Sequence, residues 1–259
     1  MVINLFLAII LGAFVGGVAG YAGSLMLTKR MSLIGGPLGH LAMPGMAIAL
    51  TYNFDVSLGA LLFISFGTFM IWLIQQKTKL PFEAITATVF ASSLSIALLL
   101  LRKKKIKAAL FGDISQISLL TVLTTITIAA IVFIILHYIY SKMLLITISS
   151  NLAKTTGVNV KLYNFIYLTC VAFVIALSVR VVGGLMTAAL VAIPACTSKN
   201  VTGTLSQYRY ISLFAGVISC VTGVLASTIT GLAIGPLIII VNAILFVVSI
   251  FVKPKFLWG

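Results

Sequence analysis

Apolar runs about as long as a membrane span fill most of this chain, with short polar or glycine- and proline-containing stretches between them. A helix needs roughly 20 apolar residues to cross the hydrocarbon core of a bilayer. The 259 residues are 61% hydrophobic and 8% charged, whereas soluble globular chains carry roughly 25% charged residues. The pattern predicts an all-α polytopic membrane protein with about eight or nine transmembrane helices. The predicted spans are 2–27, 38–52, 56–75, 84–101, 117–141, 162–180, 182–198, 209–229 and 232–252.

This composition excludes a soluble enzyme, a disordered protein and a disulfide scaffold. No stretch is long and polar enough for a separate water-soluble domain, so we expect one transmembrane domain over residues 1–259. The N-terminal run lacks a basic region before it and is too long for a signal peptide, so we expect a retained span. The cysteines form no CxxC pair and lie inside apolar runs, which predicts core packing for Cys170, Cys196 and Cys220.

The net charge of +14 follows the membrane pattern and does not indicate nucleic-acid binding. With about nine spans, most Lys and Arg residues fall on one side, which predicts a cytoplasmic face and an external N-terminus. One basic cluster falls on the other side. Either a span is miscounted, or an external loop there meets an acidic partner or lipid headgroups. The cluster consists of Arg102, Lys103, Lys104, Lys105 and Lys107.

Small and hydroxylated residues inside the spans indicate helix packing. Gly12, Gly16 and Gly20 recur at four-residue steps and share one helix face, so another backbone can approach closely. Serine and threonine in 121–128 and 222–230 can bond to carbonyls of their own helix.

His40 is the main candidate for chemistry, because an ionisable group at membrane depth is costly. Imidazole also binds transition metals commonly. Glycine and proline on both sides predict a broken or kinked helix that lines a cavity. The other interpretation is a neutral imidazole bonded to a backbone carbonyl. The break would involve Gly35, Gly36, Pro37 and Gly39 before the histidine and Pro44 and Gly45 after it.

The remaining ionisable residues favour structural roles. Glu83 suits the dipole of a first helical turn, Asp113 can cap a helix, and His137 is expected near the interface. The sequence has no G-x-x-x-x-G-K-[ST] phosphate loop and no paired carboxylates. Any nucleotide hydrolysis that drives transport must therefore occur on another subunit.

Several segments, in order along the chain, resemble the permease subunits of ABC transporters that import zinc, manganese or iron. Residues 30–50 resemble the family's R-x-x-L-x-G-D-A-L-S-H-A-x-L-P-G-x-A-L-A, and 110–114 match L-F-G-D-I/L. Residues 182–197 resemble V-G-x-L-L-x-x-A-L-L-I-I-P-A-A-T, and 234–246 fit a closing G-P-x-I-V-x-x-A-x-x-F pattern. Gly112, Asp113, Gly183, Gly184 and Pro194 are the motif residues with expected structural roles.

The resemblance implies a fold like that of type II ABC importers, in a bacterial plasma (inner) membrane. Two permease chains would form the pathway for a divalent metal ion, two ATPase subunits would bind ATP, and an extracytoplasmic binding protein would deliver the ion. No covalently bound cofactor is implied. The basic 102–107 loop is then a candidate contact for the binding protein. Residues 149–160 resemble the coupling helix that docks in the ATPase, with Asn151, Leu152, Ala153, Lys154 and Gly157 as its motif positions.

One departure from the family pattern concerns the metal. The family has an Asp four residues before the histidine and a Ser directly before it, where this chain has Gly36 and Gly39. One imidazole without a carboxylate is a poorer zinc or manganese site. The alternatives are a weaker transit site, a different ion, or a chelated metal. The rival functions are a siderophore or haem permease, a secondary ion carrier or channel, an intramembrane enzyme, and a structural or assembly membrane protein.

Overall fold

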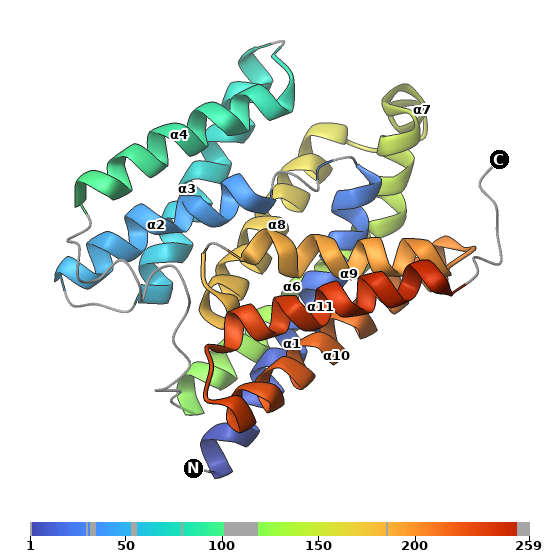
Figure 1. Cartoon of the computed structure of the whole chain (residues 1–259). Helices are drawn as coiled ribbons and strands as arrows, with labels where there is room; N and C mark the ends of the chain where they lie inside the picture. Colours follow the sequence, from blue (N-terminus) through green and yellow to red (C-terminus); the bar gives the residue numbers. More distant parts are fainter. Residues whose placement is uncertain are drawn as a thin grey trace.

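The computed structural model describes residues 2–29, 31, 35–52, 56–78, 80–100, 119–184 and 186–252, and these are helical apart from short connections (Figure 1). Its helix boundaries follow the apolar runs of the sequence closely. The helices are α1 Val2–Thr28, α2 Gly35–Tyr52, α3 Val56–Lys77, α4 Phe82–Leu100, α6 Leu119–Ile148, α7 Ser150–Thr155, α8 Val160–Val182, α9 Thr187–Val201, α10 Leu205–Thr230 and α11 Ile234–Phe251.

Six helices within the described residues are long and apolar enough to cross a bilayer. They are Leu5–Thr28, Leu58–Lys77, Val122–Ile148, Val160–Val182, Leu205–Thr230 and Ile234–Phe251. The apolar part of α4, Phe82–Ala97, is shorter. Helices α2 and α9 each contain a proline, Pro44 and Pro194, and α9 has only 15 residues. The all-helical membrane fold is thus confirmed, and the count of eight or nine spans stays a prediction.

The helices form two groups (Figure 1). Helices α2, α3 and α4 pack on one another and join the rest through α8 and α9. Helix α1 lies in the middle of the second group and contacts α6, α8, α9 and α10, and α11 packs on α9 and α10. Because α1 has neighbours on several sides, most of its residues between Leu11 and Met26 are buried.

The glycine face of α1 packs as predicted, mainly against α10. A side chain at Gly16 would overlap the carbonyl oxygen of Gly216, and one at Gly20 would overlap that of Ser212. Gly12 has ordinary clearance, since a Cβ atom there would lie 3.6 Å from the side chains of Cys220 and Val224. The two backbones therefore approach as closely as small residues permit, as in other membrane helix pairs.

Two further predictions about the spans are confirmed. Hydroxyl groups in both predicted segments donate to carbonyls one turn earlier, as Thr127 does to Leu123 at 2.8 Å and Thr222 to Ile218 at 2.6 Å. The three cysteines are free thiols, with Cys170 and Cys220 buried and Cys196 partly buried. The hydroxyl groups thus find acceptors within their own helix, and the thiols are weak hydrogen-bonding groups that can be buried. Both suit the low-dielectric interior of a membrane.

Candidate functional site

Helix α2 carries His40, and it runs without interruption from Gly35 to Tyr52. Of the predicted broken or kinked helix, a break does not occur over these residues, and a kink stays a prediction. Pro37 lies in the first turn, where backbone N–H groups have no partner within the helix, so proline is tolerated there. Pro44 lies inside the helix, where neighbouring helices can support the altered backbone.

Pro44 changes the chemistry of His40 even though the helix continues. In an α-helix the carbonyl of residue 40 accepts from the N–H of residue 44, and proline has no N–H. The His40 carbonyl oxygen is therefore left without its helical donor. The Nδ1 atom of the same residue is buried and has no hydrogen-bond partner among the described residues. The alternative of a neutral imidazole bonded to a carbonyl through Nδ1 finds no support here.

The His40 ring lies between α2 and α4. Its centroid is 5.2 Å from that of Phe90, with the two ring planes tilted by 46°. The side chain is partly exposed, and the preceding Gly39 is buried. The imidazole is thus held against the Phe90 ring with its Nδ1 buried and unpartnered, while part of the side chain stays accessible, and imidazole is a common ligand of transition metals.

The turn between α8 and α9 packs against α2 at Gly39, the residue before His40. A Cβ atom on Gly39 would overlap the Thr187 hydroxyl and would lie 2.9 Å from the carbonyl oxygen of Gly184. Thr187 Oγ1 itself donates to that carbonyl at 3.3 Å. Gly183 has a φ of 83°, a conformation that favours glycine, and it ends α8. The resembling segments 30–50 and 182–197 therefore meet in space at Gly39, the residue directly before the histidine.

This meeting explains one departure from the family pattern. A serine directly before the histidine would need the space that Thr187 and the Gly184 carbonyl occupy, so Gly39 fits this chain. Thr187 and Phe90 are the neighbours of the site that sequence reasoning missed. Only the unusual glycine at 39 pointed toward a close contact, and nothing in the sequence indicated the partner.

Donor groups for a metal are sparse around the histidine. Within the described residues, no group of three or more His, Cys, Asp and Glu side chains could hold a metal ion. Gly36 belongs to the first turn of α2 and supplies no side-chain ligand. One imidazole is the side-chain donor that the described residues offer at this position, and a single donor suits brief binding better than tight binding.

The predicted coupling segment forms a short surface helix, α7, between α6 and α8. Ser149 accepts from the N–H of Leu152 at 3.2 Å and begins the helix. Gly157, with a φ of 80°, ends it: its N–H donates to Lys154 and that of Val158 to Ala153, as in a Schellman motif. Ala153 is buried, while Asn151, Leu152 and Lys154 are exposed. The short helix, capped at both ends, thus exposes polar residues and one apolar residue on the same surface.

Other predicted residues are placed as follows. Pro194 is buried in α9 beside Gly20 of α1. Glu83 is exposed in the first turn of α4, as the dipole argument predicted. His137 is exposed on α6, and its Nδ1 lies 3.2 Å from the Tyr21 hydroxyl. The predictions for the basic cluster and for the L-F-G-D motif concern residues outside those that the structure describes, namely Arg102, Lys103, Lys104, Lys105, Lys107, Gly112 and Asp113.

Known proteins share both the sequence pattern and the fold. The chain is 29% identical to the high-affinity zinc uptake system membrane protein ZnuB of Buchnera aphidicola, over 92% of this chain and 94% of that protein. It is 24% identical to the manganese import system permease protein ScaB of Streptococcus parasanguinis, over 96% and 90%.

A solved structure, PsaBC from Streptococcus pneumoniae in complex with Fab, superposes with a TM-score of 0.83. The alignment covers 96% of this chain and 91% of that chain at 23% identity, so it shows a common fold. The profile of the ABC 3 transport family matches residues 1–253. These matches confirm the resemblance stated from the motifs and show a multi-pass protein of the plasma membrane. The chain belongs to the ABC 3 transport family.

Proposed function

We propose that this chain is the membrane-spanning permease subunit of an ABC importer for divalent transition metals, with zinc or manganese as the main substrates and iron as a third. The match of the ABC 3 transport family over residues 1–253 carries the proposal. The names of the relatives support it, since one is a zinc uptake protein and another a manganese permease. The chain itself has no nucleotide-binding motif, so ATP binds and is hydrolysed on a separate subunit.

The assembly in this proposal has two copies of the permease, each docked on an ATPase subunit through α7. Backbone groups at both ends of α7 have capping hydrogen bonds. In this proposal the short helix therefore keeps its shape when movement of the ATPase subunit displaces it. An extracytoplasmic metal-binding protein delivers the ion from the other side. Eight or nine spans per chain are part of this proposal, with α2, α4 and α9 crossing the membrane beside the six longer helices.

His40 is the proposed transit ligand. Its unpartnered Nδ1 and its freed carbonyl oxygen offer one nitrogen and one oxygen donor per chain, and a two-fold dimer doubles that number. Because Gly36 brings no carboxylate, the ion is held weakly and for a short time. Weak binding suits a pathway, since an ion that is held tightly does not leave.

A chelated metal is the second candidate substrate. The observation that favours it is the lack of a three-residue metal cluster within the described part of the chain. A chelate keeps its own ligands during passage, so the permease supplies shape and a single contact. The Phe90 ring beside His40 gives an apolar surface against which an organic chelator can pack.

The test is transport by the reconstituted complex of this permease, its ATPase and its binding protein in proteoliposomes. Uptake and ATPase stimulation are measured in parallel for zinc, manganese and iron. His40→Ala is compared with His137→Gln, which removes an exposed histidine from a different helix. We expect one metal to stimulate both activities, with His40→Ala lowering uptake at least about tenfold and His137→Gln leaving it unchanged.

Each other outcome changes a different part of the proposal. Robust metal uptake by the His40→Ala variant would remove the transit ligand and keep the metal importer. Uptake of a metal chelate in the absence of free-ion uptake would favour the second candidate. No stimulation by free or chelated metals would overturn the proposed substrate class.

A further inference from the structure

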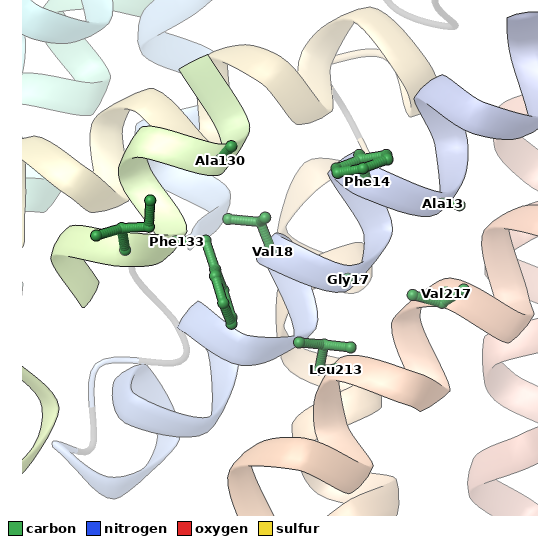
Figure 2. A pocket seen from close by; sticks show the side chains of 9 residues that line it. Ala13, Phe14, Gly17, Val18, Ala130, Phe133, Leu213 and Val217 are labelled. Atoms are coloured by element: carbon green, nitrogen blue, oxygen red, sulfur yellow. The ribbon is translucent and has the colours of Figure 1, made fainter. Parts of the chain in front are cut away.

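An apolar groove on the surface of α1, α6 and α10 has no role in the proposed transport. Figure 2 shows side chains from the three helices converging on it. Its volume of about 420 Å³ lies in the roughly 300–1,000 Å³ range of small-molecule sites. The groove is lined by residues that include Phe14 and Gly17 of α1, Phe133 and Ile134 of α6, and Leu213 and Val217 of α10.

The groove opens sideways, toward the surroundings of the helices. Phe14 and Ile134, both in its lining, are 45% and 64% exposed. Gly17 contributes no side chain, so Leu213 and Val217 of α10 pack closely against α1 at the floor of the groove. Since these three helices are among the candidate membrane spans, the groove faces hydrocarbon chains.

A cationic and aromatic cluster lies one helical turn from the groove. Arg209 precedes Leu213 by four residues on α10, and Tyr21 follows Gly17 by four on α1. The Arg209 guanidinium carbon lies 5.4 Å from the centroid of the Tyr140 ring and 4.9 Å from that of Tyr210. The distribution of Lys and Arg assigns this end of the three helices to the cytoplasmic side.

The charge of Arg209 is not neutralised by its neighbours on these helices. Its Nη2 donates a long hydrogen bond of 3.5 Å to Ser206 Oγ, and the buried Nε has no partner among the described residues. The Tyr21 hydroxyl, which lies 3.2 Å from His137 Nδ1, also interacts with Arg209, but a hydroxyl group supplies no counter-charge. The three acidic residues of the whole sequence, at 55, 83 and 113, all lie outside α1, α6 and α10. No carboxylate on these helices balances the guanidinium, so an external anion would find an uncompensated positive charge here.

We propose that this groove binds an anionic phospholipid of the cytoplasmic leaflet, with the phosphate at Arg209 and an acyl chain along the groove. Basic pockets between transmembrane helices on the cytoplasmic side are suited to anionic headgroups. The guanidinium fork matches phosphate oxygens, and Tyr210 and Tyr140 hold its plane in position. The apolar groove and the basic cluster lie on the same three helices, so one lipid can place its acyl chain in the groove and its phosphate at the arginine.

A second copy of this chain fits the groove less well. A two-fold contact brings the same surface of each copy together. The two basic clusters would then face each other, and neither copy has an acidic residue on α1, α6 or α10 to separate them. Charge complementarity thus favours a lipid as the occupant.

Native mass spectrometry of the detergent-purified complex of permease and ATPase tests the proposal. Phosphatidylglycerol and phosphatidylcholine with identical acyl chains are added in equal amounts, and the lipid retained per permease is counted. We expect about tenfold more phosphatidylglycerol than phosphatidylcholine on the unmodified chain. Arg209→Gln should remove this preference, whereas Lys161→Gln, which removes an exposed cation from α8, should keep it.

Groove filling gives an independent test that leaves the charge in place. Ala13→Phe and Ala130→Phe place a ring in the groove from α1 and from α6 and should lower retention of both lipids. Ala243→Phe, at an exposed position of α11, is the matched control. Thermal melting verifies that each variant is folded.

The outcomes separate the possible occupants. Equal retention of the two lipids by the unmodified chain, or undiminished retention in both groove-filled variants, would overturn the proposal. Loss of permease pairing in the filled variants with unchanged lipid would assign the groove to a second copy. Displacement of the lipid by glycerophosphoglycerol, which has no tails, would leave an anion site and exclude the acyl groove.

Discussion

The hydroxyl of Ser212 in α10 donates a hydrogen bond to the carbonyl oxygen of Gly20 in α1, with the two oxygens 2.5 Å apart. The bond joins residues 192 positions apart at the point where the helices cross. It forms because Gly16 and Gly20 of α1 and Gly216 of α10 have no side chains to keep the backbones apart. Helix α1 is thereby held at the centre of its group of helices.

Gly216→Val should destabilise this crossing. Its Cβ atom would overlap the carbonyl oxygen of Gly16, which is backbone and moves only with the whole helix. Overpacking of this kind costs about 1–3 kcal/mol. Thermal melting of the detergent-purified protein measures the loss. Gly12→Ala is the matched control, because its Cβ has ordinary 3.6 Å contacts, and equal melting temperatures for both variants would contradict the account.

Gly39 and Thr187 should show coupled effects on stability. Gly39→Ser introduces a Cβ atom into the space of the Thr187 hydroxyl, and Thr187→Ala removes that hydroxyl. We expect the double variant to recover about 0.5–3 kcal/mol of the loss caused by Gly39→Ser. The recovery remains incomplete, since the Gly184 carbonyl would still lie 2.9 Å from the new Cβ. Strictly additive effects in a melting experiment would show that the two residues do not meet.

Pro44→Ala should reduce metal uptake without unfolding the permease. Alanine supplies the N–H that a helix directs at the His40 carbonyl, so this oxygen is no longer free for the ion. Pro37→Ala is the comparison, because a first-turn N–H has no carbonyl partner within the helix. Uptake in proteoliposomes is measured at equal protein content. Normal uptake by Pro44→Ala would exclude the carbonyl as a ligand and leave the imidazole.

Lys29 should make the stability of the protein depend on pH in the alkaline range. It lies just beyond the first membrane span, donates to Asn164 Oδ1 at 3.0 Å and lies 4.6 Å from the centroid of the Tyr167 ring. Burial lowers the pKa of Lys29 from 10.5 to about 8. Between these values the unfolded chain binds more protons, so stability rises with pH from about 8 to about 10.5.

Below about pH 8 both states are protonated, and the lysine contributes no slope. The full change is on the order of 3 kcal/mol, at 1.36 kcal/mol for each unit of pKa. Lys29→Met removes the titrating group and should flatten the curve, whereas Lys161→Met, at an exposed position, should not. Identical pH profiles of the melting temperature for the unmodified chain and Lys29→Met would refute the assignment.

Leu152→Asp should weaken the association with the ATPase subunit. Leu152 is 50% exposed on α7, where the coupling proposal places it in an apolar contact. A charge there costs at least about tenfold in affinity because it is desolvated on docking. Leu232→Asp, at a 61% exposed position in the loop between α10 and α11, serves as the control. Co-purification of the two subunits measures the effect, and full retention with Leu152→Asp would remove α7 from the interface.

Local patterns in the sequence predicted the parts that depend on neighbouring residues. The apolar runs located the helices, as the match between span 162–180 and α8 Val160–Val182 shows. The steps of Gly12, Gly16 and Gly20 predicted a packing face, and the polar turn before Gly157 predicted a surface segment. A break within residues 35–52 was not found, because Pro37 lies in the first turn and Gly39 is a packing residue, and a kink there stays a prediction.

The sequence by itself determined that the chain is an all-helical membrane protein, because the length and spacing of apolar runs depend only on the thickness of a bilayer. Its ordered motifs also determined the family. Only the tertiary structure decided that Gly39 meets Thr187, that Gly20 meets Ser212, and that Arg209 lies over the rings of Tyr140 and Tyr210. Such contacts depend on which faces of distant helices come together, and the hydropathy of one helix does not predict which helix packs against it.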